Sequence, residues 1–366
     1  MALFPLTGTE GLYQPWVNAG VASVDAINAS GGINGHKIDL KICDLGDTAN
    51  TALACGQQAV ADHAAATFGF PMTASFETYL KSANIPIFST QVDPLLFTSP
   101  VSFADVGSNT ASFASLGKIE GCKKETAIMA FPGTPSANLA FLKAFTQTAA
   151  KIGLPNSVVL APATSSDYSP YISKAVSGGA DCLTLLGIGP SQVELAQAAS
   201  SLPAKIKLMT STGFLSTETI KSMGAVAQRL IVNSSTSSST DTSNPAVRQW
   251  LAAIAKYSPS PKATDGDSAM VWSMVQALET ATKKIKGPIT GQATLQALNN
   301  MKTYNPGVAP PVSFSSPAPS YAQGPRNFGI WAIIVQIHKD GLLYQVGTHP
   351  WYNTFTGAVY QNTVGW

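Results

Sequence analysis

The chain has 366 residues, enough for two domains that each bury a hydrophobic core. Hydrophobic residues make up 45% of it, charged residues only 11%, and the net charge is +2, which excludes a disordered, highly charged chain and a basic field for nucleic acid. No apolar run reaches the roughly 18 residues needed to span a bilayer.

The first 44 residues predict a strand, a helix and a second strand. Residues 2–6 are apolar and lead into a turn that contains two glycines. Apolar residues then recur at helical spacing as far as Ile27, and Gly31-Gly32 ends the helix. From residue 38 to 42 apolar and charged residues alternate, as in a half-exposed strand. This order is the opening βαβ unit of an α/β domain.

Alternating helices and strands continue along most of the chain. Apolar periodicity, caps and turn residues predict them. The expected helices are 51–62, 75–82, 110–120, 137–152, 170–177, 192–200, 217–223, 245–257, 265–286 and 291–299. The expected strands are 64–70, 85–89, 126–131, 157–160, 183–186, 206–210 and 230–232, and residues 330–337 and 342–346 predict a terminal hairpin around Lys339-Asp340-Gly341.

The opening unit resembles a known family. Pro5-Leu6-Thr7-Gly8 matches a PLSG-like turn after the first strand, and residues 27–35, reading INASGGING, match an IN-x-x-GGI-x-G signature that continues into Lys37-Ile38. By these motifs the chain is identified as similar to type I periplasmic solute-binding proteins, in the branched-chain amino-acid-binding branch of ABC importers. The resemblance also implies a mature or trimmed chain, with part of the first strand missing or replaced, because MALFPLTG lacks the features of a signal peptide.

The resemblance implies two Rossmann-like lobes with parallel sheets, joined by three hinge crossings. Three irregular stretches suit such crossings: residues 91–106, the polar run 233–244, which we expect to be exposed, and the Pro-rich segment 305–326. The expected lobes are residues 1–105 plus 236–315 and residues 106–235 plus 325–366, with the ligand in a cleft between them. Ligands of open parallel sheets lie beyond the carboxyl ends of the strands.

The four cysteines fall into two pairs. Cys43 ends the second strand and Cys55 lies in the following helix, while Cys122 and Cys182 each precede an apolar strand segment. Because neighbouring strand starts can approach to the roughly 5.5 Å that a disulfide requires, we expect the bridges Cys43–Cys55 and Cys122–Cys182, and therefore an oxidising compartment. The alternative is four buried free thiols. The scattered histidines and the lack of Cys-x-x-Cys predict no metal site.

The loops after the strands contain neither lysine nor arginine. This holds for residues 7–14, 71–77, 90–96, 132–137, 187–192 and 211–217. Phosphates and other dianions normally recruit such cations, so nucleotides and polyanions are disfavoured. Hydroxyl groups and helix N-termini suit a single carboxylate or a neutral polar group, and aromatic residues at these edges can cover an apolar or ring-bearing ligand.

The resemblance assigns ligand contacts to these loops. In the first lobe Tyr13 corresponds to the family's aromatic residue over the ligand, the start of the helix at 75 to the carboxylate site, and the loop after 89 to a further contact. Tyr13 and Trp16 also lie on the buried stripe of their helix, and Phe76 and Phe214 follow turns, so burial in the core is the alternative for each. The predicted contacts are Tyr13, Phe70, Thr73, Ala74, Ser75, Ser89, Gln91 and Val92 in the first lobe and Phe131, Ser136, Ile188, Gly189, Thr212 and Phe214 in the second.

Thr212 departs from the family pattern. Amino-acid-binding members usually carry an acid at this position, which pairs with the α-ammonium of the ligand. An unpaired ammonium group in a closed cleft is costly, so the ligand either lacks an α-amine or meets another acid, for which Glu10 and Asp267 are candidates. We therefore favour aromatic or aliphatic carboxylates and small polar organic solutes, with an α-amino acid second.

The motifs of common enzymes are absent from the sequence. There is no Gly-x-Ser-x-Gly, His-Glu-x-x-His or P-loop, and Gly187-Ile188-Gly189 is only a fragment of a dinucleotide fingerprint. Asn28-Ala29-Ser30 and Asn233-Ser234-Ser235 match a glycosylation sequence that often occurs by chance. We expect a non-enzyme without cofactor.

The function that the resemblance implies is that of a periplasmic or extracellular solute-binding protein of an ABC importer, which closes on its ligand by hinge motion. Its partners would be the small solute and a membrane permease, with no nucleic acid, and the chain would be a monomer. The alternative is the ligand-sensing domain of a receptor of the same fold, an amide or amino-acid sensor. Lipid anchoring, the ligand and the open or closed state are left open.

Overall fold

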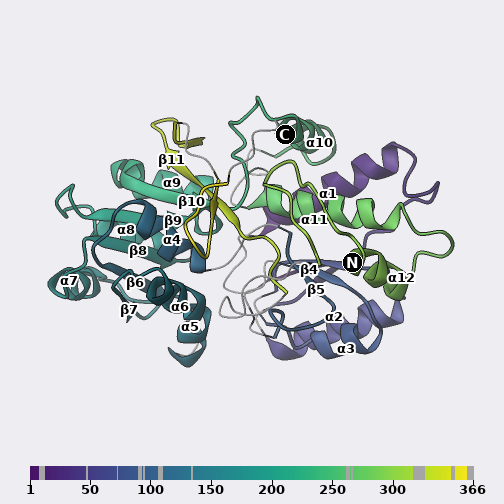
Figure 1. Ribbon diagram of the computed structural model, residues 1–366, viewed down its shortest axis with the longest axis horizontal. Helices are drawn as coiled ribbons and strands as arrows, with labels where there is room; N and C mark the ends of the chain where they lie inside the picture. The colour runs from purple at the N-terminus through teal and green to yellow at the C-terminus, as the bar shows by residue number, and fades with distance from the viewer. Residues whose placement is uncertain are drawn as a thin grey trace. The chain divides into compact units, whose positions relative to one another are not determined.

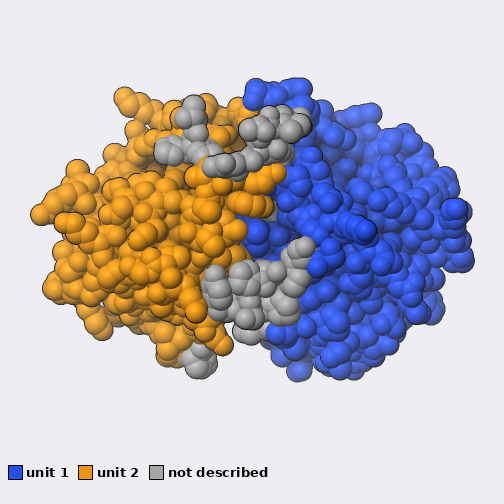
Figure 2. Space-filling view, viewed as in Figure 1, with its two compact units in different colours: residues 1–108, 242–330, 366 blue, residues 109–241, 331–365 orange. Residues whose placement is uncertain are grey.

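A computed structural model shows two compact α/β units (Figures 1 and 2). It describes residues 1–7, 13–46, 48–71, 73–89, 93, 95–105, 110–132, 135–260, 264, 267–315, 326–347 and 351–360, and only the backbone of residues 136 and 137. Unit 1 comprises Met1–Ser108, Thr242–Ile330 and Trp366, and unit 2 comprises Asn109–Asp241 and Trp331–Gly365. The chain therefore passes between the units near residues 108, 241 and 330.

Unit 1 contains a parallel sheet in the order β2-β1-β3-β4-β5. Its strands are β1 (Ala2–Phe4), β2 (Ile42–Asp44), β3 (Thr67–Gly69), β4 (Ile87–Ser89) and β5 (Ser102–Phe103). Its helices are α1 (Gln14–Ala29), α2 (Ala49–Ala61), α3 (Glu77–Ser82), α10 (Pro245–Tyr257), α11 (Ser268–Thr282) and α12 (Gly291–Asn299).

The two faces of this sheet are covered by different helices (Figure 1). Leu3 points to one face, where it packs with Cys55 of α2 and Phe76 before α3. The neighbouring residue Phe4 points to the other face and contacts Phe68, since successive strand residues alternate. A Cβ on Gly20 of α1 would lie 2.7 Å from the Phe68 ring, so the absent side chain lets α1 approach the sheet.

Unit 2 contains a larger sheet in the order β12-β11-β10-β9-β8-β6-β7, with β13 pairing to β11. Its strands are β6 (Glu125–Ala130), β7 (Asn156–Leu160), β8 (Cys182–Gly187), β9 (Lys207–Ser211), β10 (Leu230–Ser234), β11 (Trp331–Ile337), β12 (Leu343–Gln345) and β13 (Tyr352–Asn353). Its helices are α4 (Ala111–Ile119), α5 (Pro135–Phe141), α6 (Lys143–Lys151), α7 (Ser169–Ser177), α8 (Pro190–Ala198), α9 (Thr217–Met223) and the 3-10 turns η1 (Thr212–Phe214) and η2 (Gly224–Arg229).

The strands from β6 to β10 are parallel, whereas β11 runs antiparallel to β10 and to β12. The predicted α/β fold with parallel sheets and the terminal hairpin are therefore confirmed. The short strand β13, paired at Tyr352 with Ala332 of β11, has no apolar alternation of its own and was not predicted.

The helix predicted from residue 137 to 152 is divided at Leu142. The hydroxyl of Thr110 donates to the carbonyl of Phe141 at 2.9 Å and accepts from the N–H of Phe145 at 3.2 Å. It thus inserts into the i→i+4 bond that would have joined Phe145 to Phe141. Such an insertion bends or breaks a helix, and a side chain 35 residues away cannot be recognised from local periodicity.

The strand predicted from residue 38 to 42 begins later, because β2 starts at Ile42. The side-chain amide of Asn28 binds both backbone groups of Ile38: Nδ2 donates to its carbonyl at 3.0 Å and Oδ1 accepts from its N–H at 2.7 Å. These bonds tie residue 38 to the end of α1. Residues 38–41 belong to no strand.

The polar run 233–244 was predicted to be exposed, and this is wrong for its first half. Residues 233–237 are all buried. Asn233 is 3% exposed and its amide donates to the Ser112 hydroxyl at 2.5 Å, and Ser234 donates to the carbonyl of Thr236 at 2.7 Å. Serine and threonine can be buried at low cost where they find such partners, so composition misled the prediction.

The unit boundaries differ from the predicted lobe boundaries, by 15 residues at most: unit 1 runs to Ile330, where the first lobe was expected to end at residue 315. Thr240 donates to the carbonyl of Leu343 at 2.6 Å, which keeps residues 236–241 with unit 2. The N–H of Phe328 donates to the carbonyl of Ala104 at 3.2 Å, which keeps residues 326–330 with unit 1. Residues 95–105 also belong to unit 1, and β5 forms within them.

Both predicted disulfides are confirmed. Cys43–Cys55 joins β2 to α2, and Cys122–Cys182 joins the segment before β6 to the start of β8; the Cα atoms are 5.8 Å apart in each. Their sequence separations are 12 and 60 residues.

We expect the longer disulfide loop to contribute more stability. In the chain-entropy account, removing the bridge costs about 4 kcal/mol for a 60-residue loop and about 3 kcal/mol for a 12-residue loop. Urea unfolding measures both losses of stability, in the variants Cys122→Ala/Cys182→Ala and Cys43→Ala/Cys55→Ala. A larger loss from the Cys43–Cys55 pair would contradict the entropic account.

Glu125, the first residue of β6, is a fully buried acid. Its Oε1 accepts from the Thr184 hydroxyl at 2.5 Å, and its Oε2 has no hydrogen-bond partner among the described residues. A Cβ on Gly117 of α4 would lie 2.2 Å from Oε2, so this glycine leaves room for the carboxyl group. Burial raises the pKa of Glu125 to about 8, although the bond from Thr184 opposes the rise.

The Glu125→Gln variant should have a flatter dependence of stability on pH. The raised pKa means that the native state keeps a proton that the unfolded chain releases near pH 4.5. The contribution of protonated Glu125 to the free energy of unfolding is therefore fully present below pH 4.5 and is lost as the pH rises to about 8. We expect the variant to gain on the order of 2 to 4 kcal/mol relative to the parent between pH 5 and 8. Urea titrations across this range measure it, with Glu194→Gln on the exposed side of α8 as the control. A parallel pH profile for Glu125→Gln and the parent chain would contradict this assignment.

Candidate functional site

In unit 1 the parallel strands β1, β3 and β4 end at one edge of the sheet. Residues 5–7 follow β1, Phe70 follows β3, and Ser89 is the last residue of β4. Register pairs Leu3 with Gly69 and Gly69 with Ser89, so these loops start at the same level. The carboxyl edge of a parallel sheet is where α/β proteins bind ligands.

Three aromatic rings meet at this edge. Tyr13, directly before α1, stacks on Phe70 with ring centroids 4.7 Å apart and an interplanar angle of 30°. Trp16, one turn into α1, lies edge-on to both rings, at 5.0 Å from Tyr13 and 4.8 Å from Phe70. We call Tyr13, Trp16 and Phe70 the first aromatic trio. Phe70 is half-buried and the other two are buried, so the ring of Phe70 is the most accessible of the three.

Two carboxylates at the same edge are bound by the backbone. Asp93 accepts from the N–H of Ala74 at 2.8 Å and from the N–H of Leu95 at 2.9 Å. Asp44, at the end of β2, accepts from the N–H groups of Leu6 and Gly46 and from the hydroxyl of Thr7. Burial would raise the pKa of Asp44, but these hydrogen bonds hold it below its usual value.

The loop before α3 was predicted to bind the carboxylate of a ligand, but part of it already binds a carboxylate of the protein, that of Asp93. Ala74 is buried and its N–H binds Asp93, and the Ser75 hydroxyl donates to the carbonyl of Ala49 at 2.9 Å. Thr73 is half-buried. The Ser89 hydroxyl is fully buried and has no hydrogen-bond partner in the part of the chain that the structure describes. Gln91 and Val92 lie outside the described residues.

Unit 2 presents a second set of rings at the carboxyl edge of its sheet. Phe131 follows β6, Ile188 follows β8, and η1 follows β9. The ring of Phe131 lies 5.3 Å from that of Phe214 in η1 and 5.5 Å from that of Phe141 at the end of α5. We call Phe131, Phe141 and Phe214 the second aromatic trio. Ile188 packs against the same cluster.

The turn after β8 is held by one buried side chain. Oε1 of Gln192 accepts from the N–H of Gly187 at 2.7 Å, and its Nε2 donates to the Thr210 hydroxyl at 3.1 Å. A Cβ on Gly187 would lie 2.5 Å from the backbone nitrogen of Gln192, and Gly189 has a positive φ of 57°, so both positions favour glycine. Gln192 thereby fixes the loop that carries Ile188.

The remaining predicted residues occupy less defined positions. Ser136 belongs to α5, but its side chain lies outside the described atoms. Thr212 is 3% exposed at the start of η1, and Phe214 is half-buried. Asp267, a candidate to replace the acid missing at Thr212, is buried directly before α11. Glu10, the other candidate, lies outside the described residues.

Sequence reasoning missed three parts of these edges. Trp16 and Phe141 complete the trios, but their helical spacing favoured a core position. Asp93 was not predicted, because the loop beside it was expected to bind the carboxylate of a ligand and not a carboxylate of the protein. Buried Ser235, which follows β10 at the same edge of unit 2, was hidden in a run expected to be exposed.

Chemically, each edge offers rings, hydroxyl groups and backbone N–H groups. Groups of three or more His, Cys, Asp or Glu able to hold a metal ion do not occur among the described residues. None of the described helices is both long and apolar enough to cross a membrane. Rings with a few polar groups suit the binding of a small organic molecule better than covalent catalysis.

One protein-family model matches most of the chain. Residues 2–326 match the model of a family described as "Periplasmic binding protein". The comparison with curated proteins gives no match.

Solved structures with the same fold cover nearly the whole chain. A branched-chain amino acid ABC transporter structure from Thermus thermophilus with bound valine has a TM-score of 0.78 at 15% identity, covering 95% of this chain and 94% of its own. An ABC transporter solute-binding protein from R. palustris in complex with 4-hydroxybenzoate has a TM-score of 0.75 at 16% identity, covering 97% of each chain. A fatty acid ABC transporter substrate-binding protein from Thermomonospora curvata has a TM-score of 0.74 at 16% identity, covering 98% of this chain and 95% of its own.

We expect Gln192→Leu to destabilise unit 2. Leucine has a similar size but cannot bind the N–H of Gly187, which would stay buried and unpaired at a cost of about 2 kcal/mol. Gln197→Leu is the matched control, because Gln197 lies on the exposed side of the same helix and should change stability by less than about 0.5 kcal/mol. Equal effects of the two substitutions in urea unfolding would show that Gln192 does not hold the turn.

Proposed function

Because the chain belongs to the periplasmic binding protein family, we propose that it is the extracytoplasmic solute-binding protein of an ABC importer. Its ligand is a small carboxylate or polar organic solute, with a ring-bearing carboxylate preferred. The observation that carries this proposal is the presence, in each unit, of an aromatic trio at the carboxyl ends of the parallel strands. The family assignment also supports the expectation that the chain is not an enzyme.

The preference for a ring follows from the chemistry of the two edges. Aromatic side chains gain from offset or edge-to-face contact with another ring, in addition to the area that they bury. The loops after the strands contain no lysine or arginine, so a carboxylate would be held by hydroxyl and backbone N–H groups. Within the described residues the hydroxyl of buried Ser89 has no partner, so it is one donor that such a ligand could use.

An α-amino acid fits these edges less well. By the family resemblance, Thr212 stands where amino-acid-binding members usually carry an acid, and Asp93 and Asp44 are already bound to the backbone. An ammonium group would therefore lack a carboxylate partner among these residues, which is costly in a desolvated site. A ligand without an α-amine avoids this cost.

The mechanism that we propose is hinge closure between the two units. Each unit supplies one aromatic trio, and a ligand gripped by both contacts more protein in the closed state than in the open one. Binding then shifts the population towards closure in proportion to the difference in affinity between the two states. The closed, loaded form would be presented to a membrane permease.

The ligands named for the similar structures provide a test panel: valine, 4-hydroxybenzoate and a fatty acid. We expect calorimetric titration to show the tightest binding for 4-hydroxybenzoate or another benzoate. Phe214→Ala and Phe70→Ala each remove a half-buried ring from one trio and should weaken binding at least tenfold, since about 1.4 kcal/mol corresponds to one decade in Kd.

Tyr171→Ala is the control for this experiment, because Tyr171 is a half-buried aromatic residue on α7, outside both trios. Its affinity for the ligand should equal that of the parent. Preferred binding of valine over every ring-bearing acid would contradict the ring preference. Turnover of a bound ester or amide, detected by product analysis, would contradict the proposal of a binding protein.

A further inference from the structure

The amino ends of the parallel strands in unit 2 form the edge of the sheet opposite to the second aromatic trio. This edge is reached from the segments before β6 to β10, from the last turns of α4, α6 and α7, and from the turn between β11 and β12, because β11 runs antiparallel. Six exposed lysines lie along it: Lys118, Lys123, Lys151, Lys174, Lys205 and Lys339. We call these lysines and the segments that carry them the basic edge.

Two half-buried lysines at the same edge are bound within unit 2. Lys207, the first residue of β9, forms an ion pair with Glu120 directly after α4, with 2.9 Å between Nζ and Oε2. Lys124, directly before β6, donates to the carbonyl of Gly178 after α7 at 2.6 Å. These two lysines serve the fold, whereas the six exposed lysines face solvent.

The other acids of this edge, among the described residues, are Asp181 and Asp340. Asp181 accepts from the N–H of Lys123 at 3.0 Å. Asp340 accepts from the N–H of Leu342 at 2.9 Å and from the hydroxyl of Tyr344 at 2.8 Å. Two carboxylates therefore stand against six exposed lysines, which leaves an excess of positive charge at the surface.

The ends of helices do not explain this excess. A lysine in the last turn of a helix complements the partial negative charge of the C-terminus, which accounts for the three lysines in α4, α6 and α7. Lys123, Lys205 and Lys339 lie outside the helices. Neighbouring strands start about 4.8 Å apart, less than the Debye length of about 8 Å, so the fields of lysines on adjacent segments add.

Two aliphatic side chains are exposed among these lysines. Ile119, the last residue of α4, is 36% exposed and follows Lys118. Leu342 is 47% exposed in the turn that carries Lys339. A face that only needs to be solvated gains nothing from exposed aliphatic groups. Lysines around exposed aliphatic side chains are typical of surfaces that enter the headgroup layer of a membrane.

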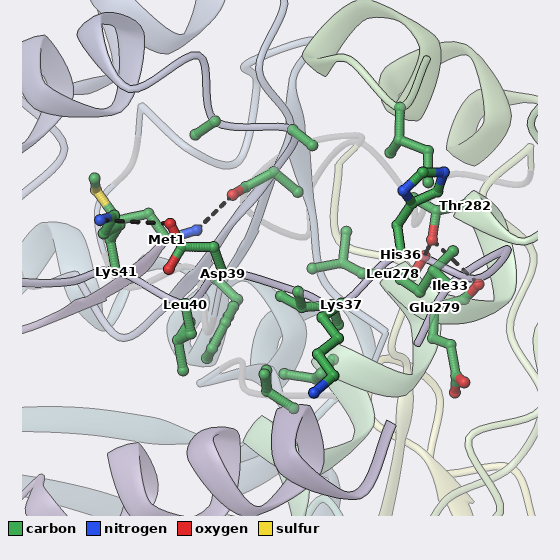
Figure 3. A pocket seen from close by; sticks show the side chains of 18 of the residues that line it. Met1, Ile33, His36, Lys37, Asp39, Leu40, Lys41, Leu278, Glu279 and Thr282 are labelled. Carbon is green, nitrogen blue, oxygen red and sulfur yellow. Dashed lines mark hydrogen bonds and ion pairs between the residues drawn. The ribbon is translucent and has the colours of Figure 1, made fainter. Parts of the chain in front are cut away.

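The pocket at the amino ends of the strands in unit 1 has a different charge pattern (Figure 3). Lys37 and Lys41 line it together with Asp39, Asp62 and Glu279. Lys41 forms an ion pair with Asp39 at 3.4 Å. Opposite charges are interspersed in this lining, so it offers an anionic surface no excess of cations.

We propose that the basic edge of unit 2 docks on an anionic membrane, with its lysines at the lipid phosphates and Ile119 and Leu342 in the headgroup layer. Charge complementarity favours this partner, because seven strands spaced about 4.8 Å apart make the edge about 29 Å wide, and a lipid surface presents negative charge over all of it. A soluble polyanion would meet the lysines but would give the aliphatic groups no apolar layer. The proposal goes beyond the proposed function, since it concerns the edge opposite to the ligand contacts.

The test is sedimentation of the full chain with vesicles of phosphatidylcholine, with and without phosphatidylglycerol. We expect binding to the anionic vesicles only, and weaker binding at high salt, because salt screens the lysines. Lys118→Gln/Lys205→Gln/Lys339→Gln should bind about a hundredfold more weakly, since each lysine near an anionic surface contributes roughly fivefold. Ile119→Ser/Leu342→Ser should bind about tenfold more weakly, at low and at high salt.

Lys143→Gln/Lys256→Gln/Lys302→Gln is the matched control. These lysines are also exposed, they lie in unit 1 or at the opposite end of α6, and the substitutions remove the same charge. The control should bind like the parent, and both triple variants should keep the thermal midpoint of the parent.

Equal weakening in the two triple variants would overturn the proposal, because it would reduce the effect to net charge. Equal binding to both kinds of vesicle would overturn it as well. Binding to heparin without binding to anionic vesicles would assign the basic edge to a soluble polyanion and would likewise contradict the membrane.

Discussion

The direction of the parallel ladder is the constraint on which both units depend. Pairing fixes every strand from β1 to β5, and from β6 to β10, to point the same way, so that the loops after them emerge at one edge. Residues far apart in sequence, such as Tyr13 and Phe70 or Phe131 and Phe214, meet only because of this. The aromatic trios are thus a product of topology, and their chemistry is that of rings with few charges.

Much of the fold could be predicted from the sequence because local signals were strong. The apolar strands from β6 to β10, the turn at Lys339-Asp340-Gly341 and both cysteine pairs followed from periodicity, turn chemistry and strand order. The failures have non-local causes. Thr110 divides the helix at Leu142 by a bond from 35 residues away, and the buried Ser/Thr run after Asn233 depends on partners such as Ser112.

For the site, the sequence predicted several of the residues but not the neighbours that they contact. Tyr13, Phe70, Phe131 and Phe214 were identified because they stand next to strand ends, which is a local property. Trp16 and Phe141 were not, because a ring on a helix looks the same whether it faces the core or a neighbouring ring at the sheet edge. The binding of Asp93 to Ala74 could not be foreseen either, since it joins two loops whose closeness follows from the pairing of β3 with β4.

Buried Asn233 has a consequence for producing the protein. It begins the acceptor sequence Asn233-Ser234-Ser235, yet its amide is bound to Ser112 and sits in a strand whose partner, β11, is synthesised about a hundred residues later. A eukaryotic secretory host would expose this asparagine to its oligosaccharide transferase before β11 has left the ribosome. A glycan attached there would block the pairing of β10, so such a host would yield a misfolded fraction that a bacterial host would not.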